Sequence, residues 1–102
     1  MFKDGMRPIH PGEVLLEEYL MPLDMSPHAL AKALHLPPSR INEVVRQERG
    51  VTEDTALRLS RYFKTTPQFW LNLQMQYNLK TTAEKVLPAI EAEIQPCELV
   101  KA

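Results

Sequence analysis

The sequence predicts an all-α fold, a compact bundle of five helices plus a C-terminal helix. Prolines stand at several points where helices should begin, and proline favours the first helical position because its missing N–H would be unpaired there. Between these prolines, apolar residues recur three and four positions apart, as on one face of a helix. No segment alternates apolar and polar residues with the period of two that a half-buried strand requires.

The first predicted helix begins at Pro11 and ends before Pro22. Glu13 falls in its first turn, where a carboxylate interacts favourably with the helix dipole. Leu15 and Tyr19 are four positions apart and so lie on one face of the helix. Pro22 cannot continue the helix because it lacks an N–H and clashes with the preceding turn.

Two short helices follow. The first covers residues 27–34 and begins with Ser26 and Pro27, a capping residue followed by a proline at the first helical position. The second covers residues 38–47. Gly50 comes soon after it, in the region where glycine commonly ends a helix.

The fourth predicted helix covers residues 53–63, with Thr52 as its N-cap. The fifth covers residues 68–79 and repeats the cap-plus-proline signal in Thr66 and Pro67.

This fifth helix carries apolar side chains on two sides, which predicts two packing partners. The side that we expect to face the core consists of Trp70, Leu73 and Tyr77. The partner of the other side is the C-terminal helix, a second copy of the chain or another protein. That side consists of Leu71, Met75 and Leu79.

A last amphipathic stretch spans residues 81–95, and Pro88 is expected to kink it or to mark its true start. We therefore divide the chain into an N-terminal arm (1–8), a helical domain (9–80), the C-terminal helix (81–95) and a short tail (96–102). The apolar face of the C-terminal stretch consists of Ala83, Val86, Leu87, Ile90 and Ile94.

Length and composition argue against several classes of protein. The chain of 102 residues corresponds to one domain, and its net charge of −1 does not fit a polycation. No apolar run reaches the roughly 18–20 residues needed to cross a bilayer. Cys97 is the single cysteine, so it cannot form an internal disulfide. The N-terminus lacks the apolar stretch of a signal peptide, and we expect a cytoplasmic protein.

The sequence gives no indication of a cofactor or a metal. Three glycines are too few for a Gly-rich phosphate loop, and the zinc-binding motifs HExxH and paired Cys-x-x-Cys are absent. The histidines, His10, His28 and His35, do not have the spacing of metal ligands. We therefore expect no cofactor, no metal and no enzymatic activity.

The helices over residues 27–34 and 38–47 are joined by about three residues, the spacing of a helix-turn-helix. Ile41, Val44 and Val45 give the second helix a core side, and polar side chains cover the opposite face. Arginine, asparagine, serine and glutamate can hydrogen bond to base edges in the major groove of DNA. The alternative is an ordinary solvated helix face. The candidate DNA-contacting residues are Ser39, Arg40, Asn42, Glu43 and Arg46.

Three segments of the sequence resemble HigA-type antitoxins, a family of Xre or Cro-repressor helix-turn-helix proteins that is also labelled virulence-associated protein I. The first is HPGEVLLEEYL followed by Pro22 and Leu23, the second is LPPSRINEVVRQERGVTEDTALRLSRYF, and the third is TTPQFWLNLQMQYNL. They occur in the family's order and span about Arg7 to Leu79. The resemblance implies a fold like that of the lambda repressor.

The resemblance also implies a function. Proteins of this family neutralise a RelE-like toxin that cleaves mRNA and, as homodimers, repress their shared promoter by binding operator DNA. The alternative is a stand-alone transcription regulator without a toxin partner. Family DNA contacts correspond by position to Ser39, Arg40, Asn42 and Glu43, with phosphate contacts from Ser26, Arg46 and Arg49. The candidate dimer or partner contacts are Leu71, Met75, Leu79, Leu87, Ile90 and Ile94.

The sequence departs from the family pattern at two turns. His35 stands where the family commonly has glycine, which predicts a slightly strained turn. Gln47 and Glu48 replace a frequent glycine and basic residue, which removes positive charge beside the DNA face. A third hypothesis is therefore a module that binds the toxin but has lost useful DNA binding.

Two charged surfaces leave alternatives open. Arg58 and Arg61 share a face of the fourth helix, and we favour plain solvation over phosphate contact. Three acids in the first helix form a solvated face or, alternatively, a docking surface for a basic toxin. These acids are Glu13, Glu17 and Glu18.

Overall fold

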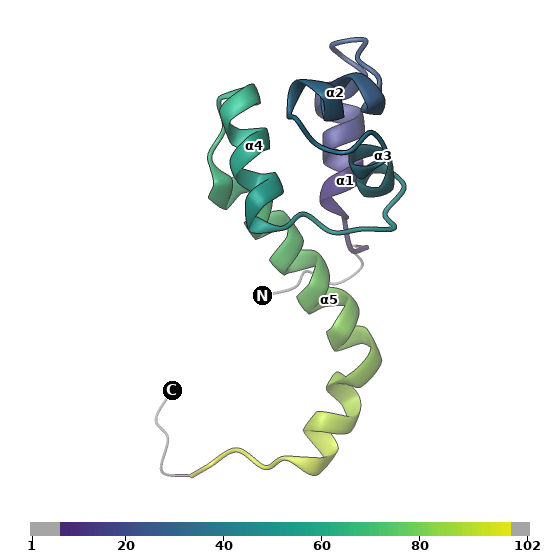
Figure 1. The fold of residues 1–102 in the computed structure, drawn as a ribbon. Helices are drawn as coiled ribbons and strands as arrows, with labels where there is room; N and C mark the ends of the chain where they lie inside the picture. Colours follow the sequence, from purple (N-terminus) through teal and green to yellow (C-terminus); the bar gives the residue numbers. More distant parts are fainter. Residues whose placement is uncertain (1–6, 99–102) are drawn as a thin grey trace.

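A computed structural model describes residues 7–98, and within that range it is all-helical (Figure 1). Positions 1–6 of the predicted arm and 99–102 of the predicted tail lie outside the described residues. The all-α bundle is confirmed. The elements in chain order are α1 (Pro11–Val14), its π-helical continuation η1 (Leu15–Leu20), α2 (Pro27–Ala33), α3 (Arg40–Val45), α4 (Glu53–Phe63) and α5 (Pro67–Glu93).

Three helices begin at the capping residues that the sequence predicts. The Ser26 hydroxyl accepts a hydrogen bond from the Ala29 N–H at 3.0 Å, at the start of α2. The Thr52 and Thr66 hydroxyls do the same at the start of α4 and α5, with distances of 3.4 and 3.1 Å. Each bond satisfies an N–H that the helix itself leaves without a partner.

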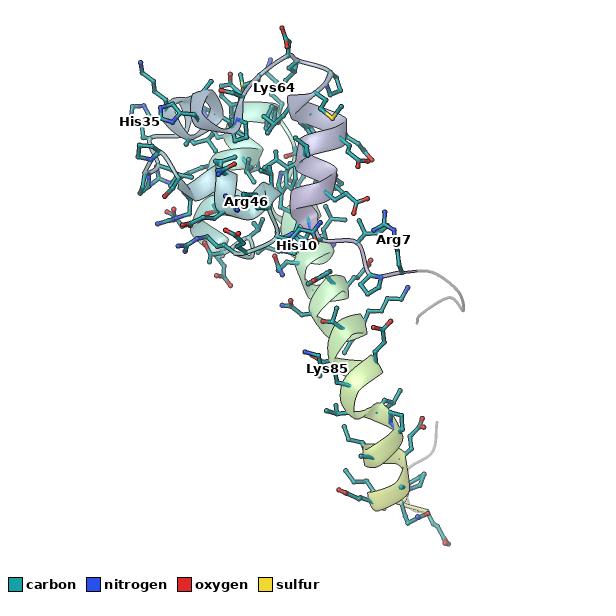
Figure 2. The ribbon with its side chains drawn as sticks, turned by 90° about the vertical axis from the view of Figure 1, so that its right-hand side faces the viewer. Arg7, His10, His35, Arg46, Lys64 and Lys85 are labelled. Atoms are coloured by element: carbon teal, nitrogen blue, oxygen red, sulfur yellow. The ribbon has the colours of Figure 1, made fainter. Side chains whose placement is uncertain are left out.

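The cap of α1 was not predicted. The buried imidazole of His10 accepts a hydrogen bond at Nδ1 from the Gly12 N–H, at 2.9 Å. The edge of this ring meets Tyr77 of α5, with 4.8 Å between the ring centroids. Figure 2 shows His10 where the start of α1 lies against α5. Burial lowers the pKa of His10 from its ordinary value.

The core lies between α1 with η1, the helix-turn-helix pair, α4 and the first part of α5. Trp70 of α5 is fully buried, as expected, and its Nε1 donates to the Thr65 hydroxyl at 2.8 Å. Tyr19 packs on Trp70 at 5.2 Å between ring centroids. The buried apolar residues are Leu15, Leu20, Leu30, Ala31, Leu34, Ile41, Val44, Val51, Ala56, Leu59 and Trp70.

The backbones of α1 and α3 approach closely at Gly12. A Cβ atom on Gly12 would lie 1.9 Å from the carbonyl oxygen of Val44, well inside the van der Waals radii. Only glycine allows this contact, and α3 consequently lies directly on the first turn of α1.

Four helices end in the same kind of turn. Asp24, His35, Gln47 and Lys64 each adopt the left-handed conformation, with φ between 52° and 63°. The residue after each of them donates its N–H to the carbonyl five positions back, at 2.9–3.1 Å. This is the Schellman arrangement, which usually places glycine at the left-handed position. The strained turn predicted at His35 is therefore present.

The structure corrects two predictions. The stretch 81–95 is not a separate helix, because α5 continues unbroken from Pro67 to Glu93 and accommodates Pro88 within it. The residues around Pro88 are exposed, so the lost hydrogen bond faces solvent, and α5 curves away from the bundle (Figure 1). In addition, α3 already ends at Val45, and Gln47 rather than Gly50 takes the left-handed position.

The projecting end of α5 makes the molecule elongated, with dimensions of 53 × 23 × 22 Å. Within residues 7–98, no helix has both the length and the apolar character needed to cross a membrane.

We predict that Gly12→Ala destabilises the fold by about 3 kcal/mol, the upper part of the range for overpacking. By helix propensity alone, alanine would stabilise the helix relative to glycine, so a loss of stability isolates the clash with the Val44 carbonyl. Urea unfolding of both proteins measures the difference. Gly50→Ala is the comparison: its Cβ would meet the end of the Gln74 side chain at 2.8 Å, so it should disturb one hydrogen bond but no backbone packing, and should cost less stability than Gly12→Ala. Equal stability of Gly12→Ala and the wild type would contradict the prediction.

We also predict a pH-dependent stability that originates at His10. Its pKa is lower in the folded protein than the ordinary 6.5, so the unfolded chain binds more protons as the pH falls below that value. The stabilisation is fully present above pH 6.5 and is lost as the pH falls through the lower folded pKa. His10→Asn keeps a capping oxygen without a titrating group and should flatten this part of the profile, measured by urea unfolding between about pH 5 and 8. If the stability of the wild type and of His10→Asn changes with pH in the same way, His10 is not the source of the pH dependence.

Candidate nucleic-acid interface

The helix-turn-helix consists of α2, the connecting residues 34–39 and α3. Leu30 and Ala31 anchor α2 in the core, and Ile41 and Val44 anchor α3. Leu36 fills the turn as a half-buried side chain, as its apolar character predicts. With its inner side fixed in this way, α3 presents its polar side to solvent.

The starts of α2 and α3 border one shallow groove. Its lining brings together three of the predicted DNA-contacting residues, Ser26, Ser39 and Asn42. Ser26 uses its hydroxyl as the cap of α2, whereas the Ser39 side chain makes no cap hydrogen bond. The full lining is Ser26, Pro27, His28, Pro38, Ser39 and Asn42.

His28 is the polar member of this groove that sequence reasoning missed. The prediction considered base contacts from the second helix only. The signal was available, because His28 lies two residues after the Ser26 cap and therefore in the first turn of α2.

Two of the predicted cationic contacts are already paired within the protein. The Nε atom of Arg49 lies 2.8 Å from a Glu43 carboxylate oxygen, and Arg46 lies 3.4 Å from the carboxylate of Glu48. Arg40 is half-buried and makes no ion pair within the described residues. The interface therefore offers little unpaired positive charge, as the departures at Gln47 and Glu48 predict.

Arg58 corrects the prediction of plain solvation. Its guanidinium donates to the carbonyl oxygens of Leu34 at 2.8 Å and His35 at 3.4 Å, and it pairs with Asp54 at 2.9 Å. These carbonyls belong to the end of α2, so Arg58 connects α4 to the turn of the helix-turn-helix.

The outer face of α5 is a separate apolar surface. Leu71 lies half-buried against the core, but Met75 and Leu79 are more than half exposed. Of the three alternatives for their partner, the C-terminal helix is wrong, because that segment continues α5 and extends away from the bundle, where Figure 2 shows Lys85. Farther along α5, Leu87 is half-buried, and Ile90 and Ile94 are exposed. Val86 is also exposed, although it was not among the predicted dimer or partner contacts.

No group of three or more histidine, cysteine, aspartate or glutamate side chains that could hold a metal occurs between residues 7 and 98.

Comparison with known proteins agrees with this geometry. The helix-turn-helix family model HTH_3 matches residues 16–70. Virulence-associated protein I of Dichelobacter nodosus is 64% identical over 78 residues, which cover 76% of this chain and 72% of that protein.

Two solved structures of antitoxins are also similar. The Pseudomonas aeruginosa antitoxin HigA with the higBA promoter is 51% identical, has a TM-score of 0.87 and is matched over 88% of this chain and 98% of its own. A HigA-family addiction module antidote protein from Coxiella burnetii is 48% identical, has a TM-score of 0.86 and is matched over 90% and 100%. Of these relatives, two are named as an antitoxin and an antidote protein, and one of the two structures includes promoter DNA. The fold, the three sequence segments and these similarities together show that the chain belongs to the HigA antitoxin family of helix-turn-helix proteins.

Proposed function

We propose that this protein is the antitoxin of a type II toxin–antitoxin module. It binds the operator DNA of its own gene as a dimer in the cytoplasm and neutralises a RelE-like toxin. The observation that carries the proposal is the helix-turn-helix with a polar outer face on α3, in a chain 51% identical to an antitoxin whose structure includes promoter DNA. The fold argues against a module that has lost DNA binding, because it matches that of an antitoxin solved with promoter DNA at a TM-score of 0.87.

The start of α3 supplies the base contacts in this proposal. Arg40 is suited to guanine, Asn42 to adenine, and Glu43 to the amino group of cytosine. Ser39 stands beside them at the N-cap position of α3. In a helix-turn-helix the first residues of the second helix are the ones that reach base edges.

Contacts to the DNA backbone come from Ser26, Arg46 and Arg49, with His28 beside the same groove. Both arginines must leave their internal carboxylate partners, Glu48 and Glu43, to bind phosphate. A phosphate oxygen then replaces a carboxylate oxygen, so little net charge attraction is gained. We therefore expect a shallower salt dependence than for a strongly basic repressor.

Dimerisation uses the outer face of α5 in this proposal. Helix-turn-helix dimers bind half-sites ~34 Å apart, which requires a second copy held at a fixed distance. The exposed apolar side chains recur four or seven positions apart along the helix, the pattern of a helix–helix contact. They are Met75, Leu79, Val86, Ile90 and Ile94, with Leu87 half-buried next to them and Leu71 at the core end.

The stand-alone regulator remains the second candidate, because the same helix-turn-helix would serve it equally well. A reading frame for a small RelE-like protein next to this gene would favour the antitoxin. Its product should copurify with this chain.

The central prediction concerns binding to the DNA upstream of the gene. The wild type should bind this duplex ~10³-fold or more tightly than a scrambled one, measured by fluorescence anisotropy at ~50–200 mM salt. Arg40→Ala should weaken operator binding by ~1–3 kcal/mol if the side chain reads a base. Arg61→Ala is the matched control on the exposed face of α4. Equal, weak binding of the wild type to both duplexes would refute the operator role, unless the toxin is required as co-repressor.

The dimer is tested separately. Leu79→Glu and Ile90→Glu place a charge in the apolar face of α5 and should shift the protein from dimer to monomer in sedimentation velocity, because an unpaired charge would be buried. Lys85→Glu introduces the same side chain outside the apolar face, about 120° around the helix from Leu79, and should leave the dimer intact. A monomeric wild type at micromolar concentration would exclude this dimer surface.

A further inference from the structure

The recognition helix α3 is short, and two polar side chains hold the segments at its two ends. Only Ile41 and Val44 are fully buried on its six residues. Such a small apolar contact leaves the tilt of α3 poorly determined, because burial of apolar area is not directional. Hydrogen bonds to the flanking backbone supply the direction that apolar packing lacks.

The first of these side chains is Arg58 of α4, which holds the turn before α3. It donates to the carbonyls of Leu34 at 2.8 Å and His35 at 3.4 Å, where α2 ends and its carbonyls lack helical partners. Asp54 fixes the guanidinium from the same helix, at 2.9 Å. The turn includes the left-handed His35 with φ 58°, so Arg58 stabilises a conformation that histidine adopts at a cost.

The second is Gln74 of α5, which holds the loop after α3. Its Oε1 accepts from the N–H of the buried Val51 at 2.7 Å, and its Nε2 donates to Asn78 at 2.9 Å. Gly50 allows this approach, because a Cβ there would lie 2.8 Å from the same oxygen. Gln74 directly precedes the exposed Met75. The hydrogen bond to the loop after α3 and the start of the exposed apolar face therefore lie in the same turn of α5.

We infer that Arg58 and Gln74 are positioning residues for operator recognition: they set the orientation of α3 from α4 and α5 without touching DNA. The inference rests on the proposed DNA binding. It distinguishes Arg58 from an arginine that serves only phosphate, because its Nε donates to Asp54 and its Nη1 donates to the Leu34 and His35 carbonyls. The inference also couples α5 to the orientation of α3, because a movement of α5 would displace Val51 and the loop that follows α3.

The test compares operator and scrambled duplexes for Arg58→Ala and Gln74→Ala. Each variant should bind the operator roughly tenfold more weakly, the order of one mismatched base pair, because base contacts depend on the angle of α3. Binding to the scrambled duplex and its salt dependence should not change, because contacts to phosphate tolerate small changes of angle. Gln74→Glu keeps the acceptor for the Val51 N–H and should restore operator affinity.

Controls distinguish positioning from folding. Arg61 lies on the same side of α4 as Arg58, and Gln76 is exposed on α5. The variants Arg61→Ala and Gln76→Ala should therefore bind the operator like the wild type. Circular dichroism and thermal unfolding identify any variant that fails to fold. If Arg58→Ala does not fold, Arg58→Lys takes its place, because it keeps the charge but cannot reproduce the planar fork of donors.

Three outcomes would overturn the inference. Unchanged operator affinity in both alanine variants would show that α3 needs neither side chain. A parallel loss on both duplexes with a reduced salt slope would show that Arg58 contacts phosphate. A wild type that binds both duplexes equally would remove the proposed operator binding, and this inference with it. The first two outcomes would leave the proposed function standing.

Discussion

The contact between the backbones of α1 and α3 at Gly12 is the constraint on which the rest of the structure depends. A helix without a side chain at this position lies directly against the Val44 carbonyl, so the recognition helix cannot slide along α1. The same place holds the His10 cap and its contact with Tyr77. One small region therefore joins α1, α3 and α5, and the polar face of α3 is presented from a fixed base.

Charge contributes little to this DNA face, and shape must contribute more. The protein carries a net charge of −1, and its candidate phosphate-binding arginines are paired with Glu43 and Glu48. A protein with such a surface gains little from long-range attraction to DNA. In the proposed binding mode, discrimination depends on how accurately a few side chains meet base edges, and hydrogen bonds from α4 and α5 hold the backbone on either side of α3.

Features set by a few neighbouring residues could be predicted from the sequence, and those set by distant contacts could not. The caps at Ser26, Thr52 and Thr66 are local hydrogen bonds, and all three were predicted. The His10 cap is also local, because its acceptor lies two positions from Gly12, but histidine is not among the residues that usually cap helices. The bonds of Arg58 join residues 23 and 24 positions apart, so no local pattern indicates them. The continuous α5 was missed because a proline argues locally against a helix, whereas the exposed side of this helix tolerates it.

The four left-handed turns have a consequence for the lifetime of the protein in a cell. Each places a non-glycine residue in a conformation that costs roughly 1–2 kcal/mol, against a total stability of about 5–15 kcal/mol for a typical domain. The unfolded fraction rises about tenfold for every 1.4 kcal/mol lost, and proteases act on that fraction. Each turn therefore lowers the stability of the fold, and glycine at His35 or Gln47 should reduce the unfolded fraction on which proteases act.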